Sequence, residues 1–281
     1  MTTIGFLGFG EVASRFAPAL QAGGAKVVAY DVLDKPGMLP LAEMIAAADI
    51  VLSTVTTDVA LPAAKSCVPH LGARNVYVDL NATSPGLKRE IAAVIAPSGA
   101  QFVEGAILPA VNVMGAKSQV LVCGKRAAEL AATLTTLGLN FEAYGEEIGK
   151  ASSFKMLRSI FSKGLEALLV ECLLASRRAG VEQDLWREIV ATLDAASFEE
   201  IGSNCVRTHG TAHARRYHEM IQVEALLREM GVDAPMTAAT VALFERSGRL
   251  RLKERFVAAP KTATEVIAAL DASLAESPSQ T

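Results

Sequence analysis

A glycine-rich turn between two short apolar strands is the feature that most constrains this chain. A strand predicted over residues 3–7 leads into the turn Gly8-Phe9-Gly10, and a helix predicted over residues 12–21 follows. A second predicted strand, 26–30, ends at Asp31. Because strand, turn, helix, strand and acid occur in that order, the segment predicts a dinucleotide-binding unit rather than a generic strand–helix turn.

Each residue of this pattern has its own physical role. Gly8 permits the tight turn, Gly10 lets the backbone approach a pyrophosphate, and Ala13 allows the helix to pack closely on the strand. The helix N-terminus adds free N–H groups and the positive end of its dipole for the phosphates. Asp31 is expected to accept a ribose 2′-hydroxyl and to favour NAD over NADP, with Lys35 near enough to soften its repulsion of a 2′-phosphate. The other expected cofactor contacts are Phe9, Glu11, Val12, Thr54, Val55 and Thr56.

The rest of the first half alternates short apolar runs with helical segments. Predicted strands are 50–55, 76–80, 101–107, 119–123 and 141–144, and predicted helices are 39–47, 60–67, 86–96 and 126–137. Such alternation predicts a mostly parallel, doubly wound α/β sheet with helices on both faces.

The strand signal stops near Tyr144, and the second half of the chain reads as helical. A long helix is predicted over 151–179, a segment with no proline and a single internal glycine. Further helices are expected over 183–195, 215–230, 237–246 and 262–275. We therefore expect a Rossmann domain at 1–148 and an all-α domain at 149–281 that starts with a long interdomain helix.

Composition excludes several classes of function. The 281 residues suffice for two domains of ordinary size, and a net charge of −3 gives no basic footprint for nucleic acid. No apolar run reaches membrane-spanning length, so no membrane association is expected. The four cysteines form no C-x-x-C pair, and the N-terminus leads directly into a strand. These features predict a cytoplasmic protein with reduced cysteines and no signal peptide.

The loop after the predicted strand 76–80 carries short polar side chains. It reads Asp79-Leu80-Asn81-Ala82-Thr83-Ser84-Pro85 and follows the carboxyl end of a strand, where open α/β sheets bind ligands. Asn81 and Thr83 are suited to hold a substrate hydroxyl, carbonyl or carboxylate. The alternative is that Thr83 or Ser84 caps the following helix, a role that does not need Asn81.

The long helix opens with a polar stripe opposite an apolar one. The polar stripe is Lys155, Arg158, Ser159, Ser162 and Glu166, and the apolar stripe is Phe154, Leu157, Phe161, Leu165 and Leu168. Spacing alone favours a solvated polar face. The alternative is a partly buried Lys155 whose pKa is lowered, so that the amine serves as an acid or base.

Together these segments resemble the β-hydroxyacid dehydrogenases, a family that includes 3-hydroxyisobutyrate, tartronate semialdehyde and 6-phosphogluconate enzymes. The resemblance covers nearly the whole chain. Within the family, the chain most resembles a bacterial subgroup with a divergent helical C-terminal domain. It rests on Gly8-x-Gly10, the loop from Asp79 to Pro85, and Gly149 followed six residues later by Lys155. The resemblance implies NAD(P) in the first domain, a small-molecule substrate in the cleft, Lys155 as general acid/base, and a homodimer formed through the helical domains.

Three positions depart from the pattern of that family. Asn81-Ala82 replaces Ser-Thr, Leu108-Pro109-Ala110 replaces an anion-cradling Ser-Gly-Gly, and Arg158 replaces an Asn or His. These departures predict a more apolar substrate pocket. Leu108 and Pro109 add side chains where the family has a bare backbone, and Pro109 has no N–H to donate to a carboxylate. The expected wall of this pocket is Ile107, Leu108, Val111 and Met114. The expected substrate contacts are Asn81, Thr83, Leu108, Arg158 and Ser159.

The sequence thus predicts an NAD(P)-dependent dehydrogenase or reductase that acts on CH–OH, with Lys155 as its acid/base. NAD is the expected cofactor, with NADP possible. One alternative is an imine reductase on the same scaffold, although those enzymes usually lack the lysine. Another is a regulatory protein that binds NAD(P) without turnover.

A histidine- and arginine-rich segment spans residues 207–218. His209 and His213 are four residues apart, but Gly210 intervenes and no carboxylate motif accompanies them, so no metal site is expected. A solvated basic face is the favoured interpretation, and Trp186 is expected in the core.

Overall fold

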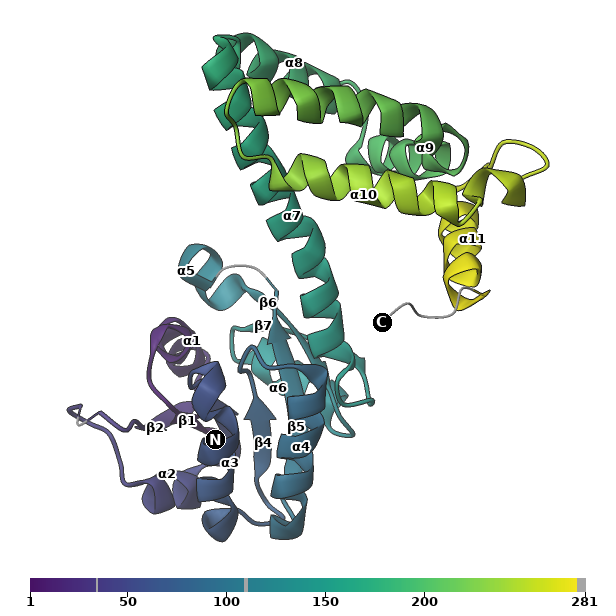
Figure 1. The fold of residues 1–281 in the computed structure, drawn as a ribbon. Coiled ribbons are helices and arrows are strands. Elements are labelled where there is room, and N and C mark those ends of the chain that lie inside the picture. Colours follow the sequence, from purple (N-terminus) through teal and green to yellow (C-terminus); the bar gives the residue numbers. More distant parts are fainter. Residues whose placement is uncertain (34, 109–110, 277–281) are drawn as a thin grey trace. The chain divides into compact units, whose positions relative to one another are not determined.

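A computed structural model describes residues 1–33, 35–108 and 111–276. Its contacts divide the chain into two compact units, Met1–Phe161 and Ser162–Thr281. The first unit holds every strand of the described residues, and the second is helical (Figure 1). Helix α7 (Lys150–Ala179) begins in the first unit and continues into the second.

One seven-stranded sheet forms the centre of the first unit. Its strands are β1 (Thr3–Leu7), β2 (Lys26–Tyr30), β3 (Ile50–Ser53), β4 (Val76–Asp79), β5 (Gln101–Ile107), β6 (Gln119–Cys123) and β7 (Asn140–Gly145). They lie in the order β2-β1-β3-β4-β5-β6-β7, parallel except for the antiparallel pair β5–β6. The expected mostly parallel, doubly wound sheet is confirmed. β1, β3 and β4 are buried on both faces, which explains their continuous apolar sequences.

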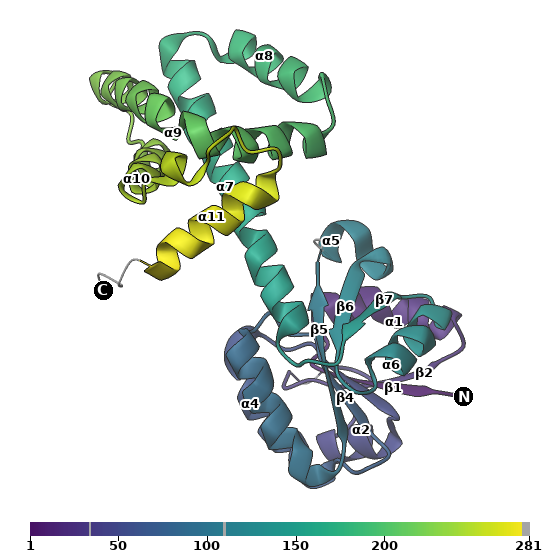
Figure 2. The same ribbon diagram turned by 90° about the vertical axis from the view of Figure 1, so that its right-hand side faces the viewer.

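Helices cover both faces of this sheet, as Figure 2 shows for α4 on one side and α1 and α6 on the other. The first face carries α1 (Glu11–Ala22) and α6 (Ala127–Thr136). The second carries α2 (Leu41–Ala47), α3 (Ala60–Cys67) and α4 (Pro85–Ile95). Short helical turns are α5 (Val111–Met114) and the 3-10 segments Thr57–Val59, Val68–His70, Ala96–Ser98, Gly115–Lys117 and Leu252–Arg255.

The register of the parallel strands brings three loops to one edge of the sheet. Leu7 pairs with Ser53, Ser53 with Asp79, and Asp79 with Glu104. The glycine turn after β1, the segment after β3 and the polar loop after β4 therefore leave the sheet at the same edge. Because β2 and β3 flank β1, the chain changes direction between β1 and β3, which is where such sheets bind nucleotides.

The second unit consists of the rest of α7 with α8 (Glu182–Asp194), α9 (Phe198–Glu229), α10 (Pro235–Arg249) and α11 (Ala263–Glu276). α9 packs against both α10 and α11. The carboxylate of Glu171 on α7 accepts hydrogen bonds from the backbone of Met236 and Thr237, and so caps α10.

Helix α9 begins 17 residues before the expected start at 215. Ser197 and Glu200 form a reciprocal capping box that starts it at Phe198, and the helix continues through Gly202 and Gly210. Gly210 is tolerated because it packs tightly, where an added Cβ would lie 2.8 Å from Pro260. No helix within the described residues is both long and apolar enough to cross a bilayer.

Candidate active site

The turn after β1 is fixed by the segment that follows β3. Gly8 has a φ of +86°, and a Cβ there would lie 2.8 Å from Cγ1 of Val55, so only glycine fits this position. The Thr54 hydroxyl donates a 2.6 Å hydrogen bond to the Gly8 carbonyl. The structure thus brings together the predicted residues Gly8, Thr54 and Val55, whereas Thr56 is exposed.

Gly10 and the start of α1 form an open, uncapped helix N-terminus. α1 begins immediately after Gly10, and no side chain of the described residues caps it. An added Cβ on Gly10 would meet no atom within 4 Å, so the backbone is accessible there. Ala13 is fully buried against the core, Val12 is half-buried and Glu11 is exposed. These features fit a pyrophosphate held by backbone N–H groups.

Asp31 at the end of β2 is bonded to the glycine turn. Its Oδ2 accepts hydrogen bonds of 2.8 Å from the Phe9 N–H and from Lys35 Nζ, and its Oδ1 accepts one of 2.9 Å from the Leu33 N–H. Burial alone would raise the pKa of the Asp31 carboxyl, but these donors together outweigh it and lower that pKa. Asp31 is therefore a carboxylate, as the sequence predicts, but one that is already paired.

The loop after β4 contains two buried polar atoms that have no hydrogen-bond partner among the described residues. These are Oδ1 of Asn81 and Oγ1 of Thr83, on side chains that are 5% and 2% exposed. The Asn81 amide nitrogen donates to Ser53 Oγ at 3.0 Å, and Ser84 caps α4 by accepting from the Leu87 N–H. Capping therefore uses Ser84 and leaves these two oxygens of Asn81 and Thr83 without a partner, which is unusual because buried polar groups are normally satisfied.

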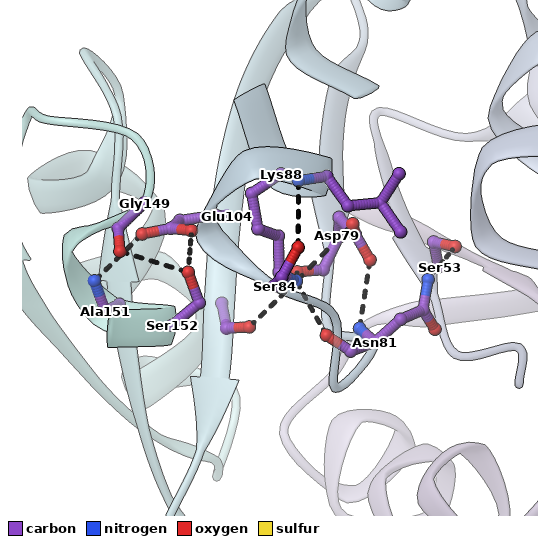
Figure 3. A network of polar contacts seen from close by, with 11 residues as sticks. Ser53, Asp79, Asn81, Ser84, Lys88, Glu104, Gly149, Ala151 and Ser152 are labelled. Carbon is purple, nitrogen blue, oxygen red and sulfur yellow. Dashed lines mark hydrogen bonds and ion pairs between the residues drawn. The ribbon is translucent and has the colours of Figure 1, made fainter. Parts of the chain in front are cut away.

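A buried lysine lies beneath this loop, as Figure 3 shows. Lys88 Nζ donates to the carbonyl oxygens of Asp79 at 2.8 Å, Asn81 at 2.7 Å and Gly105 at 3.3 Å. The ammonium also lies 3.4 Å from the Asp79 carboxylate, and both side chains are almost fully buried. Burial lowers the pKa of Lys88, while Asp79 and Glu104 oppose that change. Lys88 thus ties the loop to both β4 and β5.

Glu104 on β5 joins the sheet to the first turn of α7 (Figure 3). Its buried carboxylate accepts a 2.9 Å hydrogen bond from the Ala151 N–H and a 3.0 Å hydrogen bond from the Ser152 hydroxyl. A carboxylate is favourable there because the helix N-terminus is positive and has unpaired N–H groups. The start of α7 is therefore fixed against β5.

The apolar stripe of α7 is exposed throughout, and the polar stripe is exposed only in part. Lys155 and Ser159 are half-buried, whereas the apolar Leu157 and Ile160 are 65% and 72% exposed. Arg158 and Glu166 of the polar stripe are exposed as expected, so the expected solvated face holds for only part of the stripe. The Ser159 hydroxyl donates to the Lys155 carbonyl.

Arg158 connects α7 to the loop after β5. Its guanidinium donates a 3.1 Å hydrogen bond to the Leu108 carbonyl, which brings together two of the predicted substrate residues. The expected apolar wall is not formed as one surface, because Ile107 and Leu108 pack against different core clusters and Met114 is 46% exposed. Residues alternate between the faces of a strand, which separates these neighbours. Pro109 and Ala110 lie outside the described residues.

His209 and His213 of the second unit form a packed pair, whereas Arg215 and His218 are exposed, so the expected solvated basic face holds for only part of the segment. His209 Nε2 lies 2.8 Å from Ser247 Oγ, and His213 is 3% exposed with Nδ1 3.0 Å from the His209 carbonyl. Burial, with the charges of His213 and Arg216, lowers the pKa of His209 to about 4. In the part of the chain that the structure describes, no three His, Cys, Asp or Glu side chains form a possible metal site. Trp186, expected in the core, is 44% exposed.

Two residues of the site, Lys88 and Glu104, were missing from the sequence predictions. Glu104 left a signal, because it is a single charged residue within the apolar strand Gln101–Ile107. Lys88 left none, since a lysine in the second turn of an amphipathic helix normally faces solvent.

Comparison with known proteins places this arrangement in a family. Residues 176–247, from the end of α7 to α10, match the model of a family described as a domain of unknown function, DUF1932. A conserved hypothetical protein from Sinorhizobium meliloti is 33% identical, with a TM-score of 0.60 and 97% of each chain covered. The conserved protein MTH1747 is also 33% identical, with a TM-score of 0.60 over 89% of this chain and 98% of its own. Its structure is described as similar to 3-hydroxyacid dehydrogenases.

This chain belongs to the β-hydroxyacid dehydrogenase family. Its members are NAD(P)-dependent oxidoreductases, and the DUF1932 segment marks the divergent C-terminal domain of its subgroup. An uncharacterized 28.5 kDa protein from Methanothermus fervidus is 28% identical over 253 residues, 86% of this chain and 97% of that protein. An imine reductase from Bacillus cereus shares the fold, with a TM-score of 0.77 at 16% identity over 96% of this chain and 99% of its own.

Proposed function

We propose that this chain is an NAD(P)-dependent oxidoreductase that interconverts a β-hydroxyacid-like alcohol and its carbonyl compound, with Lys155 as general acid/base. The observation that carries the proposal is the bond between Glu104 and the first turn of α7. This bond fixes the start of α7, and with it the segment of Lys155, to β5. Strand β5 lies next to β4, and the loop that follows β4 carries Asn81 and Thr83. In this proposal the Lys155 amine, one turn after this fixed point, lies toward the unpaired Asn81 and Thr83 oxygens, where it is suited to proton transfer.

The cofactor site is assembled from the first three strands. Bound NAD(P) supplies the hydride acceptor or donor. The backbone at Gly10 and the uncapped start of α1 would hold the pyrophosphate, and Asp31 would accept a hydroxyl of the adenosine ribose. Solved imine reductases of this fold are described in complex with NAD+ and NADP+.

The chain's own residues handle the substrate oxygen and its proton. Asn81 Oδ1 accepts a hydrogen bond from the substrate hydroxyl, and the Thr83 hydroxyl donates one to the substrate oxygen, since both atoms are buried and lack partners among the described residues. Lys155 takes the hydroxyl proton during oxidation and returns it to the carbonyl oxygen during reduction. Arg158, bonded to the loop carbonyl of Leu108, is the cation available for a substrate carboxylate.

Imine reduction on the same scaffold is the second candidate. Several solved imine reductases share this fold, including one from Aspergillus terreus with a TM-score of 0.76 at 18% identity. Lys155 favours alcohol–carbonyl chemistry, because an amine can accept the hydroxyl proton that such oxidation releases.

A substrate panel followed by the absorbance of the reduced nicotinamide tests this proposal. Purified protein is given hydroxy acids, aldehydes and ketones, and cyclic imines, each with NAD(H) and NADP(H). Turnover of a hydroxy acid or its carbonyl compound supports the proposal, and turnover of imines alone replaces it with the second candidate. Cofactor binding without any turnover would leave a regulatory protein.

We also propose that the protein is a homodimer through its helical region, from α7 onward. Large apolar side chains are exposed along α7 and α8, which is unusual for a monomer. They are Leu157, Ile160, Phe161, Leu165, Leu168, Trp186 and Leu193. Light scattering should give twice the chain mass for the wild type and a lower mass for Ile160→Glu. A monomeric wild type would contradict the dimer.

A further inference from the structure

The end of β2 carries an ion pair that the glycine turn shares. Lys35 Nζ donates to Asp31 Oδ2 at 2.8 Å and to the Phe9 carbonyl at 3.0 Å, while the Phe9 N–H donates to the same carboxylate oxygen. Phe9 lies between the two glycines that would meet the cofactor. Lysine and aspartate are therefore both attached to the turn, and neither is an independent surface charge.

The pair changes the charge that a cofactor meets at this corner. A lone carboxylate would accept a ribose 2′-hydroxyl and repel a 2′-phosphate. Here the ammonium balances the carboxylate, so a phosphate meets no uncompensated negative charge. The carboxylate can still accept a hydroxyl, because each oxygen accepts more than one hydrogen bond.

The two partners also differ in accessibility. The Lys35 side chain is 34% exposed, whereas that of Asp31 is only 9% exposed. Among the described residues the ammonium has two acceptors, which leaves one of its three N–H groups for an anion. An incoming phosphate dianion therefore reaches the cation more readily than the carboxylate.

We propose that Lys35, held by Asp31 and Phe9, is the residue that admits a 2′-phosphate, so that the chain binds NADP(H) about as well as NAD(H). This inference rests on the proposed cofactor site. It replaces the preference for NAD expected from Asp31 alone. Lys35 thus acts as a specificity-determining residue for the 2′-phosphate of NADP(H), and Asp31 accepts the 2′-hydroxyl of NAD(H).

Binding measurements on the full-length protein test the proposal without reference to turnover. The dissociation constants of NADH and NADPH are measured by nicotinamide fluorescence, and those of ADP-ribose and its 2′-phosphate by calorimetry. The variants are Lys35→Ala, Lys35→Arg and Asp31→Asn. Lys26→Ala is the matched control, since Lys26 is an exposed lysine at the opposite end of β2.

The wild type should bind both reduced cofactors within about tenfold of each other. Lys35→Ala should weaken NADPH by roughly tenfold, as expected for loss of one charge-assisted contact, and leave NADH within about twofold. Lys35→Arg should restore NADPH binding, and Asp31→Asn should weaken NADH more than NADPH. The NADPH effect should shrink at high salt because the contact is partly exposed.

Two results would overturn the inference. Equal weakening of both cofactors by Lys35→Ala would make the lysine only a support for the turn, and a melting temperature for each variant identifies loss of folding. A wild-type preference for NADH of about a hundredfold or more would restore the role of Asp31 as a discriminating acid. Failure of the wild type to bind either cofactor would instead refute the proposed function.

Discussion

The carboxylate of Glu104 on β5 accepts a 3.0 Å hydrogen bond from the hydroxyl of Ser152, 48 residues later in the first turn of α7. Ser152→Ala removes one donor from a fully buried carboxylate. We expect it to lower the free energy of unfolding by about 1–3 kcal/mol in urea denaturation. Ser153→Ala is the matched control, since its half-buried hydroxyl donates to the Gly149 carbonyl and has no bond to Glu104 among the described residues. It should lower the free energy of unfolding by less than Ser152→Ala. Equal losses would mean that Glu104 does not need Ser152.

Replacement of Lys155 by alanine tests its role in catalysis. The variant should fold and bind the cofactor, and its turnover should fall by roughly 10²–10⁴-fold, as is typical for loss of a general acid/base. Lys163→Ala, at an exposed lysine further along α7, should keep full turnover. Wild-type turnover in Lys155→Ala would exclude the lysine from the chemistry.

Lys88→Met tests the buried ammonium beneath the loop that follows β4. The substitution preserves apolar volume but leaves the Asp79 carboxylate and three carbonyl oxygens without their donor. We expect a loss of about 3–5 kcal/mol in the free energy of unfolding, as for other broken buried ion pairs. Lys65→Met, at an exposed lysine on α3, should change that free energy by less than about 0.5 kcal/mol. A small loss of unfolding free energy in Lys88→Met would show that the loop after β4 does not depend on this ammonium.

Gly10→Ala separates cofactor binding from folding. Gly10 has a φ of −92°, which alanine adopts readily, and the added methyl group meets no atom within 4 Å. The melting temperature should therefore stay at the wild-type value. Cofactor affinity should fall by roughly tenfold or more, because the methyl group occupies the approach of the pyrophosphate. Unchanged affinity would refute the assignment of this backbone to the phosphates.

The sequence predicted the sheet well because its strands are apolar runs bounded by turns. Four of the seven strands match the structure at both ends, and two more match at one end. The sequence could not predict the partners of Glu104, which lie 47 and 48 residues away. The hydrophobic periodicity separated a polar from an apolar face of α7, but it could not predict how far each face is exposed. The cap formed by Ser84 was predictable from Ser84-Pro85, whereas the descent of Lys88 beneath the loop depends on packing between α4 and β5.

The histidine pair predicts a pH dependence of stability. The pKa of His209 is lowered from 6.5 to about 4 in the folded protein, so between these values the unfolded chain binds a proton that the folded chain does not. Stability should consequently fall as the pH drops from 6.5 toward 4. Thermal melts across this range should show a smaller drop for His209→Asn than for the wild type. His218→Asn, at an exposed histidine of the same helix, should retain the wild-type slope.

The continuity of α7 has a consequence for dissecting the protein. A fragment that stops before residue 150 loses the Ala151 N–H and the Ser152 hydroxyl, and leaves the Glu104 carboxylate buried without these donors. A fragment that extends to Phe161 retains both donors and the lysine at 155. The nucleotide-binding half is therefore best isolated with a helical stub that sequence-based trimming would discard, and its solubility then depends on replacing apolar residues such as Ile160 on that stub.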